Sequence, residues 1–349
     1  MMKAFVGSIL VVLCTAQITV PAQTQSGHEP QTFLQNQLAF TANELGSLEQ
    51  GQIIVRLPRP AETREVAVFA IMRLDVSEDF FLHRMRDIVN FKKSDNVLQI
   101  GKFSDPPTLK DLEALTLDSA EIDTIRQCRV SKCDFKMSAQ QIERFRKEVN
   151  WSAPDYRDRV TALTREMLLE RVKSYLLGGN RALGEYNDKA YRLSLADEFK
   201  SLLQPAVFTY GYGSEFQAYL VDFPHSRPLY VESFFYWSKE KFGLKPVITV
   251  THVTVYRPSG AHGADILIAS KGIYASHYYE ASLGLTGYIH NQSSGPSRSY
   301  LMYINRSKTD ALRGMFPGLK RSLISGRLRE GTKKNMELIK EKLESEHAK

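Results

Sequence analysis

The C-terminal third of the chain is a series of segments in which apolar and polar residues alternate, and this pattern constrains the fold most. Side chains on one face of a β-strand recur with period two, so each segment is expected to form a strand. Short turn sequences rich in glycine, proline and serine separate several of the segments, which favours antiparallel neighbours. The expected strands cover residues 228–238, 245–257, 264–272, 272–290 and 299–307.

The first half of the chain contributes two more strands and a helix between them. In residues 66–76 the apolar residues fall on one face and the other face turns polar toward its end, which predicts a half-buried strand. Apolar residues then recur at helical spacing over 78–89, behind Asp75 and Glu78, which have capping-box spacing. Residues 97–103 are expected to form a second, short strand.

A long region between these strands and the C-terminal ones has helical periodicity. Several segments carry apolar residues three or four positions apart, and the clearest of them runs over 156–177. The sequence GGN at 178–180 is expected to end that helix. We therefore expect a helical insertion at about 105–205.

The chain is expected to end in one long helix. After Arg306 the pattern is helical to about residue 345, and Pro317 and Gly326 are expected to kink or split the helix. The predicted fold class is α+β, an antiparallel sheet packed on a long C-terminal helix, with the helical insertion inside a single domain over 48–346.

The first residues have the pattern of a secretory signal peptide. Lys3 precedes an apolar run that ends at Cys14 and is too short for a resident membrane span, so residues 1–22 are expected to be removed. The polar segment 23–47 is expected to be a flexible tether. Lipid attachment at Cys14 is not favoured because the large Leu13 precedes it. We therefore expect an exported protein, periplasmic or secreted.

Two cysteines remain after this cleavage, Cys128 and Cys133. In an oxidising compartment a local disulfide is the expected outcome. The spacing does not fit haem attachment. A redox-active pair and a metal site are the alternatives, and no histidine lies nearby in the sequence to complete a metal site.

The order strand, helix, antiparallel strands and long final helix resembles the helix-grip arrangement of the START and Bet v 1 superfamily. The resemblance covers 60–104 and 227–345, and the insertion departs from it. It implies a curved sheet around a long helix with an apolar cavity that binds lipids, sterols or similar ligands, and some members are hydrolases or cyclases. The segments YWSKE, SHYYEAS and SLISGR are also similar to exported bacterial proteins.

Two histidines in neighbouring alternating rows are the main candidates for a site. His252 shares a row with Tyr256, and His277 shares a row with Tyr279. If both rows face the same side, the imidazoles could line one cavity as polar groups, or act as acid or base with Tyr256, Tyr279 or Glu232. The alternative is that each is a neutral core histidine with a hydrogen-bond partner.

Aromatic residues add to this picture, since FFYW at 234–237 supplies apolar area for a core or a cavity wall. The ligand-binding candidates are His252, His277, Tyr256, Tyr279, Glu232 and Trp237. No metal is expected, because His277 and Glu280 would lie on opposite faces of a strand. No cofactor is expected either, and neither a phosphate-binding loop nor a serine nucleophile motif occurs.

The formal net charge is +7, and many basic residues lie in the last helix. A solvated helix face explains them, and attraction to anionic lipid headgroups is the functional alternative. The candidate membrane contacts are Lys320, Arg321, Arg327 and Arg329. Nucleic acid is not expected as the partner of an exported protein.

Three functions are consistent with these features. The favoured one is an exported binding protein that encloses an apolar or lipid-like ligand. The second is an interaction module of the cell envelope without a cavity. The third is an enzyme of the same fold that uses His252 or His277 with a tyrosine, so whether the chain is an enzyme stays open.

Overall fold

The computed structural model describes residues 30–203, 213–258, 265–290, 299–313 and 317–349. The predicted signal peptide lies outside these residues. No helix within the described ranges is both long and apolar enough to span a membrane.

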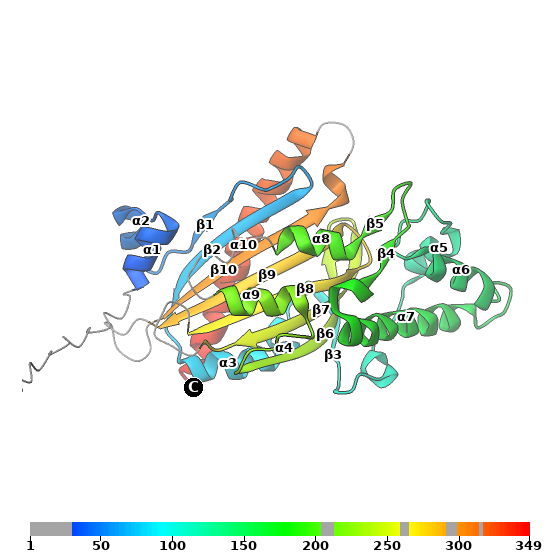
Figure 1. The fold of residues 1–349 in the computed structure, drawn as a ribbon, viewed down its shortest axis with the longest axis horizontal. Coiled ribbons are helices and arrows are strands. Elements are labelled where there is room, and N and C mark those ends of the chain that lie inside the picture. Colours follow the sequence, from blue (N-terminus) through cyan, green and yellow to red (C-terminus); the bar gives the residue numbers. More distant parts are fainter. Residues whose placement is uncertain (1–29, 204–212, 259–264, 291–298, 314–316) are drawn as a thin grey trace, which may run out of the picture.

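One antiparallel sheet of eight strands forms the centre of the molecule, in the order β1-β2-β10-β9-β8-β7-β6-β3 (Figure 1). The strands are β1 (Ile54–Arg56), β2 (Glu65–Leu74), β3 (Val97–Lys102), β6 (Val231–Phe242), β7 (Lys245–Tyr256), β8 (Ile266–Ala275), β9 (Tyr279–His290) and β10 (Ser299–Thr309). Strands β6 to β10 pair in sequence order, as the short turns predict. The last of them, β10, pairs with β2, so β2 and β3 lie far apart in the sheet.

Helices cover both faces of this sheet, which gives three layers. In β7 the even-numbered residues Ile248 and Val250 pack in a different core cluster from the odd-numbered Val253 and Val255. We call the first side the insertion face, because the helices inserted between β3 and β6 pack there, and the second side the α10 face. The predicted α+β fold, an antiparallel sheet with a long C-terminal helix on it, is confirmed.

The α10 face is covered by α10 (Pro317–His347), together with α3 (Glu78–Arg86) and α4 (Ile88–Lys92). Met336 and Leu343 of α10 are buried against the sheet. A split at Gly326 is wrong, because the helix is continuous there, whereas the expected break at Pro317 is where α10 begins, after the 3-10 turn η5 (Asp310–Leu312). Pro317 begins the helix, where a missing N–H has no cost, and Gly326 is accommodated within it.

The insertion face carries the helical insertion. Its helices are α5 (Ser119–Gln127), α6 (Ala139–Glu148), α7 (Tyr156–Gly178) and α8 (Leu195–Leu202), followed by α9 (Gly213–Asp222). A two-stranded hairpin, β4 (Glu185–Tyr186) with β5 (Leu193–Ser194), and the 3-10 turns η1 (Leu109–Leu112) and η2 (Gly179–Leu183) complete it. Cys128 and Cys133 lie at disulfide-bonding distance at the end of α5. In Figure 1, α8 and α9 lie in front of the sheet and α10 lies behind it.

The expected tether is wrong for residues 30–47, because the chain forms α1 (Pro30–Leu38) and α2 (Ala42–Glu49) there. Leu34, Leu45 and Leu48 are buried against the sheet in one cluster with Ile71. A capping box formed by Thr41 with the third residue of α2 starts the second helix. The segment was expected to be flexible because its composition is polar, but its three buried leucines lie at positions that face the sheet. Residues 23–29 of the expected tether lie outside the described range.

A close contact between neighbouring strands gives a test of this packing. A Cβ added to Gly101 in β3 would lie 2.6 Å from Nε1 of Trp237, which is fully buried. Gly101→Ala should lower the free energy of unfolding by about 2 kcal/mol, because the ring has no room to move. Urea unfolding measures the change.

The matched control is Gly46→Ala in α2, where an added Cβ meets nothing within 4 Å. This substitution should leave stability unchanged or raise it by up to about 1 kcal/mol. Equal effects of the two substitutions would contradict the packing described for Gly101.

Candidate functional site

His252 lies in the centre of the insertion face and is surrounded by aromatic rings. Phe235 stacks on the imidazole and Phe223 lies tilted against it, each with ring centroids 4.5 Å away. Its Nδ1 is 3.3 Å from the Tyr175 hydroxyl and its Nε2 is 3.3 Å from Oγ1 of Thr254. Burial, with a contribution from Lys271, places the pKa of His252 well below its usual value. The imidazole is therefore neutral and has a partner at each nitrogen.

His277 does not share a cavity with His252, so that expectation is wrong. β8 ends at Ala275 and β9 begins at Tyr279, and His277 lies in the turn between them, where Tyr278 has a φ of 61°. The imidazole packs edge-on against Phe135 with ring centroids 5.4 Å apart. The sequence pattern was wrong because it joined the end of β8 and the whole of β9 into one strand.

The remaining predicted residues are also separated. Tyr256 stacks on Phe216 in α9, and its hydroxyl donates to Oε2 of Glu215 over 3.2 Å. Trp237 is buried and donates from Nε1 to the Asp111 carbonyl over 2.7 Å. Both lie on the insertion face, away from the turn that contains His277.

Glu232 and Tyr279 lie on the opposite side, the α10 face. The Glu232 carboxylate accepts hydrogen bonds from the Arg86 guanidinium of α3, with the shorter at 2.7 Å. A register shift where β9 starts turns Tyr279 toward Tyr303 on the α10 face. The predicted candidates therefore form no common site.

A lysine that the sequence analysis did not single out lies directly opposite His252. Lys271 is paired with His252 across β7 and β8, and its side chain is 1% exposed. Its ammonium nitrogen lies 4.5 Å from the ring centroid of Phe199 and 5.2 Å from that of Tyr175. Within the described ranges no carboxylate forms an ion pair with Lys271, and its ammonium group donates to Oδ1 of Asn180. Burial lowers the pKa of Lys271 to about 7.

Asn180 connects Lys271 with a surface pocket of about 480 Å³. Its amide nitrogen donates to the Val221 carbonyl over 2.9 Å, while its amide oxygen accepts from Lys271. The pocket lies between the end of α7 with η2 and the end of α9. It is lined by Gly178, Asn180, Arg181, Ala182, Val221, Asp222, Phe223 and His225.

The α10 face carries a polar region at the end where β9 begins. Four side chains of β9 and β10 form it, and we call them the hydroxyl patch: Ser282, Tyr303, Asn305 and Ser307. The two serine hydroxyls lie 2.9 Å apart, and Ser307 donates to Oδ1 of Asn305 over 2.7 Å. Burial raises the pKa of Tyr303 and of the adjacent Tyr279, so both hydroxyls stay protonated. Most of these residues are only half-buried although they belong to interior strands.

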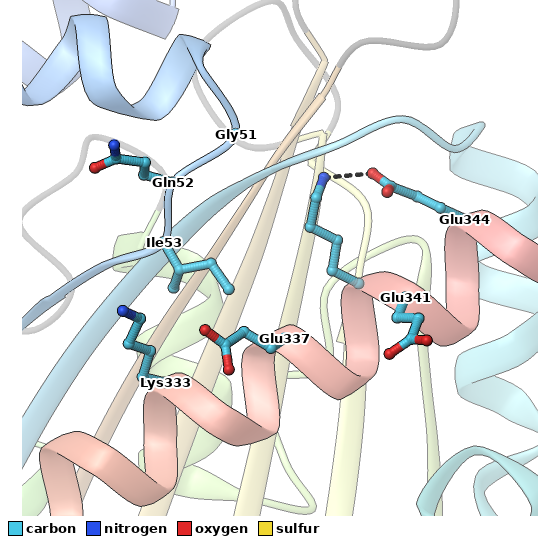
Figure 2. Close-up of a pocket in the computed structure, with 8 residues that line it drawn as sticks. Gly51, Gln52, Ile53, Lys333, Glu337, Glu341 and Glu344 are labelled. Carbon is cyan, nitrogen blue, oxygen red and sulfur yellow. Dashed lines mark hydrogen bonds and ion pairs between the residues drawn. The ribbon is translucent and has the colours of Figure 1, made fainter.

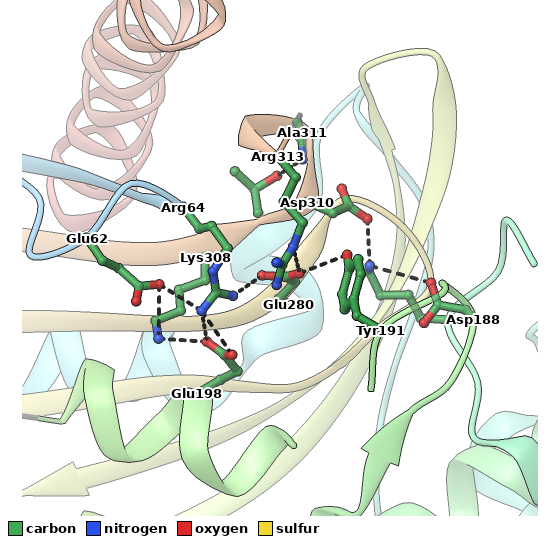
Figure 3. A network of polar contacts seen from close by, with 12 residues as sticks. Glu62, Arg64, Asp188, Tyr191, Glu198, Glu280, Lys308, Asp310, Ala311 and Arg313 are labelled. Carbon is green, nitrogen blue, oxygen red and sulfur yellow. Dashed lines mark hydrogen bonds and ion pairs between the residues drawn. The ribbon is translucent and has the colours of Figure 1, made fainter. Parts of the chain in front are cut away.

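A buried network of ion pairs joins the insertion to the start of the sheet (Figure 3). Glu280 accepts from Arg64 over 2.5 Å and from Arg313 over 2.9 Å, and Glu198 pairs with Lys308 over 2.6 Å. Acidic and basic groups alternate and have partners, which is typical of a structural network.

A second pocket, of about 530 Å³, lies between α10 and the segment that leads into β1 (Figure 2). Its lining residues are Gly51, Gln52, Ile53, Lys333, Glu337, Lys340, Glu341 and Glu344. Lys340 pairs with Glu344 over 2.5 Å and donates to the Arg73 carbonyl over 2.6 Å. The walls are mainly charged, so an apolar ligand has little surface to bury there.

The basic residues proposed for membrane contact fall into two groups. Lys320 donates to the Arg313 carbonyl over 2.9 Å, and Arg321 donates to the Glu65 carbonyl over 2.8 Å, so both hold the start of α10 to the sheet. Arg327 and Arg329 are exposed. Contact with a membrane surface stays a prediction.

Comparison with protein-family models, curated proteins and solved structures finds no match to this chain. Within the described ranges no three or more His, Cys, Asp or Glu side chains are grouped to hold a metal ion.

The buried amine of Lys271 gives a stability test. Its pKa is about 7 in the folded protein and about 10.4 in an unfolded chain, so at pH 6 folding keeps a charged amine away from water. Lys271→Met should raise the free energy of unfolding by ~3 kcal/mol at pH 6. The gain should shrink as the pH rises from 7 to 10, because the folded protein then holds a neutral amine. Urea unfolding at pH 6 and pH 9 measures both values, and a destabilised variant at pH 6 would contradict the burial.

His277 gives a second test at acid pH. Burial lowers its pKa to about 4, against about 6.5 when unfolded, so the unfolded chain binds the proton first as the pH falls. The wild-type protein should lose about 2 kcal/mol of stability from this group between pH 7 and 4.5. Charged neighbours that act on the imidazole are Asp134, Lys245, Lys136 and Asp310. His277→Phe should remove this loss in acid titrations followed by circular dichroism.

The control for that titration is His83→Phe, because His83 is exposed on α3. This variant should lose stability with falling pH as the wild type does. If His277→Phe also follows the wild-type curve, His277 is not the group that titrates.

Proposed function

We propose that this protein is an exported binding protein that holds a small amphipathic or lipid-like ligand on the α10 face. The observation that carries the proposal is the hydroxyl patch, with Tyr279 beside it: three of its four residues are only partly buried although they lie on interior strands. Elsewhere on this face, Met336 and Leu343 of α10 are buried against the strands.

The patch has the composition expected of a ligand site. The rings of Tyr279 and Tyr303 offer apolar area, and their protonated hydroxyls can donate to a ligand. Asn305 and the serines beside it supply a few polar groups that can orient the head of the ligand. An apolar tail would then lie toward the start of α10, where Leu323 is 61% exposed.

The topology supports the helix-grip resemblance as part of this proposal. The strand β2 is followed by the two short helices α3 and α4, and the last strand is followed by the long α10 on the same face. In such an arrangement the ligand lies between the sheet and the long helix; here α10 packs mainly over β1 and β2, and the hydroxyl patch lies on the neighbouring strands β9 and β10 of the same face. Export is supported by the N-terminal sequence pattern and by the Cys128–Cys133 pair.

Ligand binding can be tested by native mass spectrometry and thermal shift with fatty acids, lysophospholipids and isoprenoids. We expect at least one class to bind with one-to-one stoichiometry and raise the melting temperature. Asn305→Leu should weaken that binding about tenfold or more, because the ligand head loses a hydrogen-bond partner. Ala182→Trp, in the pocket on the opposite face, is the control and should leave the affinity unchanged.

Two results would overturn the proposal. One is that no lipid class binds or stabilises the protein. The other is that a ligand binds equally well to the wild type and to Asn305→Leu, which would place it elsewhere.

A further inference from the structure

The surroundings of Lys271 suit a reactive amine and differ from those of a buried lysine that forms an ion pair. Buried lysines are rare and normally pair with carboxylates, as Lys308 does with Glu198 in this protein. Lys271 has an amide oxygen and two aromatic rings around its ammonium group, and the neighbouring imidazole of His252 is neutral. Burial with no carboxylate partner among the described residues favours the unprotonated amine, which is the nucleophilic form.

The pocket at the end of α7 lies next to this buried amine. Asn180 is a wall of the pocket, and its side-chain oxygen meets the Lys271 amine. Phe223, another wall, stacks on Tyr175 and lies against His252. The side chain of Asn180 therefore separates the pocket from Lys271, and its amide carbonyl oxygen is in contact with the Lys271 amine.

The local backbone holds the pocket walls close together. Gly179 has a φ of +56°, and a Cβ there would overlap the Phe223 carbonyl oxygen. The ends of α7 and α9 can approach in this way only with glycine at that position. The position of the pocket walls therefore depends on the close contact between Gly179 and the Phe223 carbonyl.

We propose that Lys271 binds small aldehydes or ketones covalently, and that these enter through the pocket and displace the side chain of Asn180. The amine lone pair attacks the carbonyl carbon to give a carbinolamine. The carbonyl oxygen then leaves as water with the two amine hydrogens, so a C=N bond replaces the C=O bond and no oxidant or reductant is needed. This site lies on the opposite face from the hydroxyl patch and is independent of the ligand proposed there.

The volume and walls of the pocket indicate the size and kind of carbonyl compound. About 480 Å³ accommodates a molecule the size of an aromatic aldehyde. Phe223 and Val221 supply apolar contact, and the oppositely charged Arg181 and Asp222 both line the pocket, so the walls favour no particular charge on the compound. Long acyl chains would extend out of the pocket.

Reductive trapping tests the proposal. The folded protein is incubated at pH 7 with benzaldehyde and sodium cyanoborohydride, and the labelled lysines are located by peptide mass spectrometry. Lys271 should be labelled at least tenfold faster than the exposed Lys334, because far more of its amine is unprotonated at this pH. Labelling of Lys271 no faster than Lys334 would overturn the proposal.

Two variants test the route. Ala182→Trp fills the pocket and should lower the labelling of Lys271 at least tenfold while Lys334 reacts as before. Asn180→Ala removes the side chain between pocket and amine and should speed the labelling. Circular dichroism verifies that both variants fold. Unchanged labelling of Lys271 in folded Ala182→Trp would show that the pocket is not the route and would overturn the proposal.

Discussion

The pairing of β10 with β2 is the contact on which the rest of the architecture depends. It runs from Ser299 opposite Leu74 to Lys308 opposite Glu65 and joins the first long strand to the last. The buried Glu65 carboxylate pairs with Arg306 over 2.5 Å, and the Glu65 carbonyl accepts from Arg321 at the start of α10. The same pair of strands therefore positions α1 and α2 on one face and α10 on the other.

Covering the sheet on both faces explains why polar groups within it are paired or grouped. A polar side chain on a strand that is buried on both sides lies in the interior and needs a partner. His252 has two partners, and Glu280 is held between two arginines. The hydroxyl patch follows this rule through hydrogen bonds among its own members, whereas Lys271 has an amide oxygen in place of a carboxylate.

Periodicity was sufficient to predict most strands of the sheet, the helices of the insertion and the long final helix, because each of these elements buries one regular face; the three-residue β1 was not predicted. The buried residues Val160, Leu163, Met167 and Val172 of α7 lie on the predicted stripe. The site could not be predicted in this way. Joining β8 to β9 placed His277 in a strand, and a register shift turned Tyr279 to the other face. Strand ends and register shifts of this kind depend on how the strands pair in the folded protein, so the periodicity of the sequence does not reveal them. Lys271 was not singled out in the sequence, because its burial involves contacts with Tyr175 of α7 and Phe199 of α8 that form only in the folded protein.

The two edges of the sheet differ from its long interior strands. At one edge β1 has three residues, and at the other β3 has six, with an irregular register at Val97 and Gln99. Short or irregular edge strands offer few free backbone groups to another chain. A protein with ten- to twelve-residue strands in its interior would otherwise present long templates for strand addition. The short edge strands therefore oppose edge-to-edge aggregation of this sheet.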